Sequence, residues 1–106
     1  MPKYLIQGSY TIEGIKGVIK EGGSGRREAV SAALDAMGGR LDAIYWAFGE
    51  TDAYVICEVP DNVSALALSM GVAATGTVGV KTTVLLTVEE VDQASKKVVS
   101  FRGAGQ

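Results

Sequence analysis

The central stretch of the chain, residues 41–59, reads LDAIYWAFGETDAYVICEV. Two apolar segments flank the short turn-forming sequence GETD at residues 49–52. This arrangement is typical of a β-hairpin, so the stretch predicts one strand at 41–48 and a second at 53–59.

The turn also decides which side chains share a face of the hairpin, because successive side chains along a strand point to opposite faces. A turn centred on Glu50 and Thr51 places one set on the first face, namely Ile44, Trp46, Phe48, Ala53, Val55 and Cys57. The other face receives Tyr45, Ala47, Tyr54 and Ile56. Both faces of the hairpin are therefore mostly apolar.

A strand and two helical patterns precede the hairpin. Residues 3–10 predict a strand, and Thr11 can cap a helix whose expected inward positions are Ile12, Ile15, Val18 and Ile19. The sequence GGSG at residues 22–25 should stop that helix, and Ser24 is expected to cap a second one. The second helix has the apolar stripe Ala29, Val30, Ala33, Leu34 and Met37 and ends at Gly38 and Gly39.

A third helix and a last strand follow the hairpin. Residues 60–62 are expected to cap the helix, with Val63, Leu66, Ala67 and Met70 pointing inward. The strand covers residues 78–86, and the sequence TVEE at 87–90 matches a capping box that begins a short C-terminal helix.

The order β-α-β-β-α-β predicts an α+β, ferredoxin-like fold with an antiparallel sheet and helices on one face only. We expect a single domain over residues 1–97, including the short C-terminal helix, and a tail over 98–106. Since the helices cover one apolar face, the second face needs a partner, and a second copy of the chain would form a dimeric α/β barrel. The tail contains Val98, Val99 and Phe101, which should dock on a protein surface.

Composition limits the possible functions of the 106 residues. The net charge of −2 gives no general attraction to nucleic acid or an anionic membrane, and no apolar run reaches the roughly 20 residues that span a bilayer. A strand pattern that starts at residue 3 leaves no room for a signal peptide, so we expect a cytoplasmic protein. The chain has no histidine, and its single Cys57 lies in an apolar strand, so we expect no disulfide, metal site or cofactor.

Residues 4–11, 22–27, 48–54 and 80–87 carry a family resemblance. Through them the chain, from about residue 3 to 92, resembles the GYD-domain family, a bacterial group related to the dimeric α/β-barrel proteins. The resemblance implies the fold above and assigns no activity. Gly49 and Asp52 match the family's Gly-Tyr-Asp element, whereas Thr51 stands where the tyrosine is expected, so no role of that tyrosine is transferred.

The arginine pair after the glycine break is the first candidate site. Arg26 and Arg27 fall in the first turn of a helix, where guanidinium groups and unpaired backbone N–H groups suit a phosphate, carboxylate or sulfate. The alternative is an ion pair with Glu21 or Glu28 on the surface. Position 26 continues the apolar stripe, so we expect Arg26 to face the sheet and Lys20 to assist it.

Tyrosines and one lysine of the sheet form a second group of candidates. Tyr10, Tyr45 and Tyr54 could line a pocket with their hydroxyls, although packing in a dimer accounts for Tyr45 and Tyr54 equally well. If Lys81 is buried, it could act as a base or bind an acidic ligand. On an edge strand it would instead be a solvated charge that opposes aggregation of sheets.

These residues favour a small cytoplasmic homodimer that binds an anionic molecule between sheet and helices. Its expected ligand-binding residues are Tyr10, Lys20, Arg26, Tyr45, Tyr54 and Lys81. One alternative is a cofactor-free enzyme, similar to an oxygenase or isomerase, with tyrosine or Lys81 as acid or base. Another is a protein-interaction module that uses a sheet edge or the tail. No catalytic residue is assigned.

Overall fold

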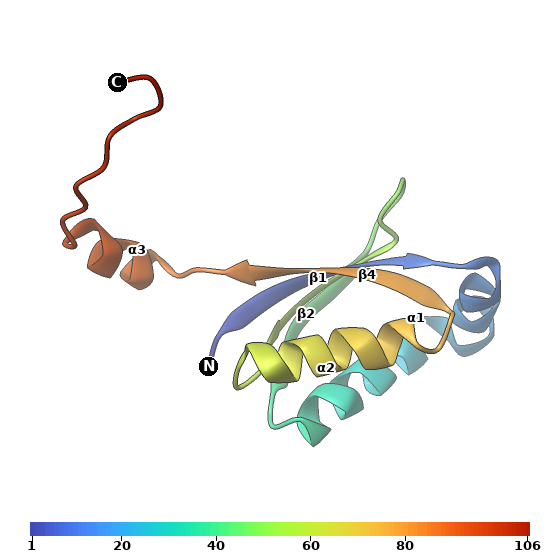
Figure 1. Cartoon of the computed structure of the whole chain (residues 1–106). Coiled ribbons are helices and arrows are strands. Elements are labelled where there is room, and N and C mark those ends of the chain that lie inside the picture. Colours follow the sequence, from blue (N-terminus) through green and yellow to red (C-terminus); the bar gives the residue numbers. More distant parts are fainter.

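Four strands pair into one antiparallel sheet in the order β2-β3-β1-β4 (Figure 1). In this computed structural model, which describes residues 1–106, the strands are β1 (Lys3–Tyr10), β2 (Arg40–Trp46), β3 (Ala53–Glu58) and β4 (Val78–Leu85). The helices are α1 (Ile12–Ala36), α2 (Asn62–Ala73) and α3 (Val88–Ser95). The predicted α+β class and the order β-α-β-β-α-β are confirmed.

The register of the central hairpin confirms the predicted faces. Tyr45 pairs with Tyr54 on one face, and the neighbouring pairs put Ile44 and Val55 on the other. The first strand is shorter than predicted, because the N–H of Ala47 already closes the turn. Phe48 therefore lies beyond the strand and is fully exposed.

A kink at Gly22 divides α1. Gly22 has φ 75° and ψ 172°, a left-handed conformation that glycine adopts without steric cost. Thr11 caps the start of α1, as predicted, by accepting a bond from the N–H of Gly14. The predicted cap at Ser24 is wrong, because the non-helical residue is Gly22 and the chain is helical again before residue 24.

The first half of α1 presents a different face to the sheet from the one predicted. Ile12, Ile15 and Ile19 are exposed, with Ile19 at 79%. The buried position is Gly14, where an added Cβ would overlap the carbonyl of Thr77. The backbone of α1 therefore approaches the start of β4 so closely that only glycine fits, and the isoleucines point outward.

The inward face of α2 was also wrongly predicted. The expected residues are exposed, namely Val63, Leu66, Ala67 and Met70, whereas Ala65, Leu68, Ser69 and Val72 lie toward the sheet. This helix is apolar on nearly every side, so its periodicity could not identify the buried side.

The two long helices cover one face of the sheet, and the core lies between them and it (Figure 1). Its buried residues are Tyr4, Leu34, Val55, Cys57, Val59 and Ala65. The chain after β4 extends away from this core, and the tail does not dock on its own domain: Val98 is 98% exposed. None of the helices has the length and apolar character needed to cross a membrane.

Candidate functional site

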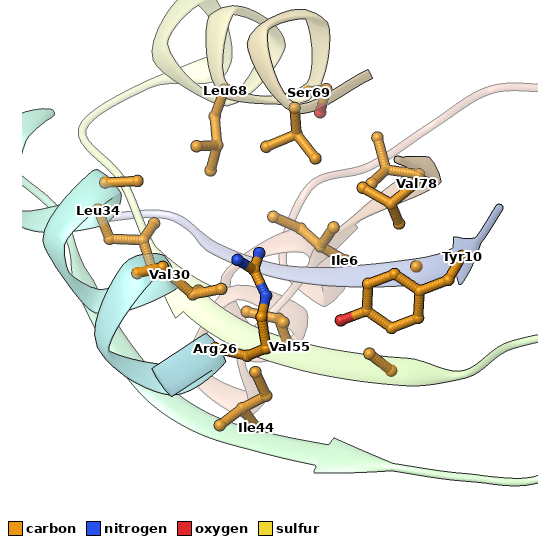
Figure 2. A pocket seen from close by; sticks show the side chains of 16 residues that line it. Ile6, Tyr10, Arg26, Val30, Leu34, Ile44, Val55, Leu68, Ser69 and Val78 are labelled. Atoms are coloured by element: carbon orange, nitrogen blue, oxygen red, sulfur yellow. The ribbon is translucent and has the colours of Figure 1, made fainter. Parts of the chain in front are cut away.

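A cavity of about 180 Å³ lies between the sheet and the helices (Figure 2). The strands supply its floor, and α2 with the second half of α1 supplies its roof. Of the 16 lining residues 13 are hydrophobic, among them Ile6, Val30, Leu34, Ile44, Val55, Leu68, Val78 and Val80. Since an apolar cavity of about 150 Å³ accepts benzene, this one is large enough for a small organic molecule.

Three polar side chains line the cavity, and two of them have hydrogen-bond donors that no other residue uses. The hydroxyl of Ser69 is already bonded, with its Oγ 2.8 Å from Oγ1 of Thr82. The guanidinium of Arg26 and the hydroxyl of Tyr10 point into the cavity (Figure 2). Arg26 donates only to Glu21, from Nη1 to Oε2 at 3.2 Å, and the Tyr10 hydroxyl has no partner within the chain. Both groups can therefore bond to a ligand.

The kink at Gly22 places Arg26 at the cavity. Glu21 stands just before the kink and Arg26 just after it, so their ion pair joins the two halves of α1. Arg26 is half-buried on the inner side of the helix, whereas Arg27 is exposed. Arg26 thus lies at the cavity and also forms the ion pair with Glu21 that was the alternative, and its role in ligand binding stays a prediction.

The hairpin turn holds Tyr10 in place. Oδ2 of Asp52 accepts a bond from the backbone N–H of Tyr10 at 2.8 Å, and the N–H of Asp52 donates to the carbonyl of Gly8 at 2.9 Å. An added Cβ at Gly8 would lie 3.2 Å from Cγ2 of Val78, so glycine keeps the floor of the cavity open. Asp52, a residue of the hairpin turn, therefore fixes the end of β1.

Comparison with known families adds an identification to this geometry. A model described as the GYD domain matches residues 4–95. The chain belongs to the GYD domain family. The match includes all four strands and all three helices, so every element that lines the cavity is part of the domain. No curated protein and no solved structure matches the chain.

The other predicted site residues of this GYD domain lie outside the cavity. One row of side chains crosses the four strands on the face that the helices leave open. Each residue of the row pairs with the next one on the neighbouring strand, in the order Tyr45, Tyr54, Gln7 and Lys81. Lys81 is exposed on the edge strand β4, and Lys20 is exposed on the first half of α1. The structure thus brings Tyr10 and Arg26 together and separates them from the other four residues.

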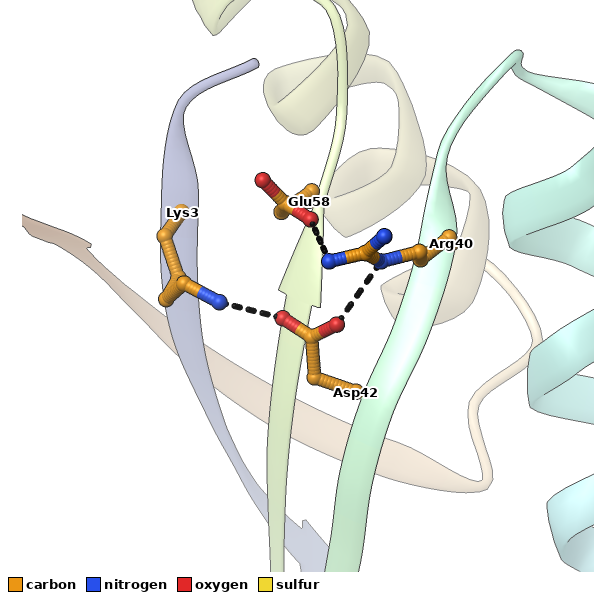
Figure 3. Close-up of polar contacts among 4 residues, drawn as sticks. All are labelled: Lys3, Arg40, Asp42 and Glu58. Atoms are coloured by element: carbon orange, nitrogen blue, oxygen red, sulfur yellow. Dashed lines mark hydrogen bonds and ion pairs between the residues drawn. The ribbon is translucent and has the colours of Figure 1, made fainter.

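A network of charges occupies one end of the open face (Figure 3). Asp42, the extra residue of a β-bulge in β2, is bonded to Lys3 and accepts at 2.9 Å from Nε of Arg40, which also pairs with Glu58. The bond from Lys3 keeps the pKa of Asp42 below its ordinary value. Two positive and two negative groups satisfy one another, so no charge remains for an ion. No group of three or more Cys, Asp or Glu side chains could hold a metal ion.

Sequence reasoning missed two polar positions on the covered face. Tyr4 is buried and donates from its hydroxyl to Oδ1 of Asn62 at 2.6 Å, and burial raises its pKa. Its role is to join β1 to the start of α2. Ser69 lines the cavity, and its signal was a hydroxyl in the middle of a mostly apolar helix, four residues after the buried Ala65.

Proposed function

We propose that this GYD domain binds a small carboxylic acid with an apolar body in the cavity between sheet and helices. The observation that carries the proposal is the pairing of an apolar enclosure with the free N–H groups of Arg26 at its edge. A guanidinium binds a carboxylate through two parallel bonds, and the hydrophobic walls favour a hydrocarbon group over water. The Tyr10 hydroxyl supplies a further donor.

A carboxylate fits this site better than inorganic phosphate. Phosphate needs donors around all its oxygens, and the walls of the cavity supply almost none, so its burial there would leave oxygens without hydrogen bonds. A carboxylate presents two oxygens on one side and can leave its apolar part among Val30, Val55 and Leu68. The ligand therefore combines one negative end with a branched or aromatic body.

The test compares benzoate and 3-methylbutanoate with their neutral amides and with phosphate and sulfate, all at matched ionic strength. The carboxylates should raise the melting temperature by several degrees, since a hundredfold excess over the dissociation constant stabilises by about 2.7 kcal/mol. The amides and the inorganic anions should raise it less. Equal melting temperatures in all solutions would contradict the proposal.

Variants of the pocket make the test specific. Arg26→Ala should weaken benzoate binding at least about tenfold, and Tyr10→Phe by a few-fold. Arg27→Ala is the matched control, because it removes the same charge from the exposed side of the same helical turn and should leave binding unchanged. Glu21→Gln should tighten binding about threefold or more, because Glu21 is the carboxylate that a ligand must repel or displace. Binding that survives Arg26→Ala would place the ligand elsewhere.

We further propose that the protein is a homodimer in which the open faces of two sheets pack together. Leu5, Ile56 and Tyr45 lie on this face, and Tyr45 is 67% exposed. The charges of Lys3, Arg40, Asp42 and Glu58 are balanced within each copy, so this end of the face brings no net repulsion when two copies stack. Ile56→Glu should give a monomer in light scattering, whereas Glu50→Gln in the exposed turn should not. A wild-type monomer at micromolar concentration would refute this proposal.

A further inference from the structure

Residues 86–106, which follow β4, form an arm. The arm contains the helix α3, which packs against no other part of the chain. A complete capping box starts α3: Thr87 Oγ1 accepts from the N–H of Glu90 at 3.1 Å, and Glu90 Oε1 accepts from the N–H of Thr87 at 3.0 Å. Yet α3 has eight residues and none of them is buried. Isolated helices shorter than about 12–15 residues are marginal in water, so α3 depends on contacts that its own domain does not give.

The arm carries apolar side chains suited to such contacts. Val88 and Val91 are exposed and lie three residues apart, so they share one side of α3. Phe101 is 83% exposed. Figure 1 shows the tail, drawn in red, on the side of the sheet opposite to α1 and α2. The tail and the open sheet face are therefore on the same side of one molecule, and α3 lies beyond the end of β4 (Figure 1).

The dimensions of the chain show how much surface lacks cover. Its accessible surface is 7436 Å², whereas a compact monomer of 11.0 kDa exposes about 5,600 Å². Its radius of gyration is 17.0 Å, compared with about 13 Å for a compact domain of this length. The excess of about 1,800 Å² exceeds the roughly 800 Å² that each partner buries in an interface of standard size. One partner of equal size can cover it.

We propose that the arm of each copy packs against a second copy of this chain, in a reciprocal exchange that accompanies pairing of the open faces. The proposal rests on the dimer proposed above and adds a segment to its interface. A second copy is the occupant because a two-fold axis covers the arm and the open face of both molecules at once and leaves neither exposed. Val88 and Val91 then lie in the interface, and α3 gains the packing that an eight-residue helix requires.

The test measures hydrogen exchange of the α3 amides together with the mass in solution of the full chain. In the wild type at micromolar concentration, α3 should be protected and the mass should be that of a dimer. Val88→Asp and Val91→Asp should each abolish this protection and weaken dimerisation at least about tenfold, as expected when a charge replaces a buried valine. Gln93→Glu is the control, because it adds a charge to α3 without altering the two valines, and it should behave as the wild type.

Each other result overturns a different part. A dimer whose α3 exchanges freely would refute the role of the arm and leave the sheet-to-sheet dimer intact. A wild-type monomer would refute both. Protection of α3 that persists in a monomeric Ile56→Glu variant would show that the arm folds back on its own domain, which also refutes the exchange.

Discussion

The two faces of the sheet come from the same four strands but are covered differently. On the face beneath the helices, Tyr4, Val55 and Cys57 are buried in one core. On the other face, Leu5 and Ile56 alternate with them along β1 and β3, and no element of the chain lies over them. The comparison shows that apolar alternation in a strand determines where side chains point, whereas cover depends on the elements that remain available.

The covered face is itself incomplete. The helices meet the sheet tightly at Leu34 and Tyr4, but they separate around Arg26 and Tyr10 and leave the cavity there. The kink at Gly22 and the small residues Gly8, Ala29 and Ala33 contribute to this space. One face is thus suited to a small molecule and the other to a second protein surface.

The largest effect should come from shortening one leucine on each side of the sheet, Leu34 of α1 above the covered face and Leu5 of β1 on the open face. Leu34→Ala should lower the free energy of unfolding by about 3 kcal/mol at every protein concentration, because Leu34 is fully buried within one chain. Leu5→Ala should cost about 1 kcal/mol in dilute protein and more as the concentration rises, because in the proposed dimer a second copy would complete its burial. Urea denaturation at two protein concentrations measures both. If the cost of Leu5→Ala does not depend on protein concentration, no second copy buries Leu5, and the proposed dimer would be refuted.

A smaller effect separates the faces by pH. Burial raises the pKa of the Cys57 thiol on the covered face from 9.0 to about 11. The neutral thiol therefore contributes stability that is complete below pH 9 and is lost as the pH rises toward 11, by at most about 2.7 kcal/mol. Asp42 on the open face has a lowered pKa, so its contribution is present above its ordinary value and is lost in acid.

Urea denaturation across the pH range gives the measurement, with Cys57→Ala and Asp42→Asn as the matched variants. Cys57→Ala should reduce the fall in the free energy of unfolding at alkaline pH and leave its fall in acid unchanged. Asp42→Asn should reduce the fall in acid and leave the fall at alkaline pH unchanged. The alkaline slope should not vanish in Cys57→Ala, because burial raises the pKa of Tyr4 as well. Identical pH profiles for Cys57→Ala and the wild type would show that the thiol is not desolvated.

The sequence predicted the strands and their faces because these depend on local alternation and on one turn. β1 was predicted at its observed bounds, and the turn at residues 49–52 correctly placed Tyr45 and Tyr54 on one face of the hairpin. The helix faces of α2 and of the first half of α1 were not predictable in the same way. In α2 apolar residues occur on every side, and in α1 a backbone contact at Gly14 outweighs the isoleucine stripe.

The candidate site was predicted only in part, because local patterns identify single residues but not which of them come together. Arg26 followed from its place on a helical stripe, and Tyr10 from its place in a strand. The prediction grouped Arg26 and Tyr10 with three residues of the open face, Tyr45, Tyr54 and Lys81. The sequence could not show that these three lie on the face of the sheet opposite to Arg26. That separation depends on the register of β1 between β3 and β4, which involves residues more than forty positions apart.

The smallest effect should come from Lys81, and it sharpens the comparison of the faces. Lys81 is exposed on the edge strand and stands across from Gln7 on the open face, whereas Arg26 lies at the cavity beneath the sheet. Lys81→Ala should change the free energy of unfolding by less than about 0.5 kcal/mol and leave benzoate binding unaltered. It should, however, make the protein aggregate faster at high concentration, because an edge strand loses the charge that opposes pairing with another sheet. Calorimetric titration and turbidity measure the two outcomes, with Lys20→Ala as a control that removes an exposed lysine from α1. A loss of benzoate affinity in Lys81→Ala alone would mean that the ligand lies on the open face, and the assignment of the two faces would have to be exchanged.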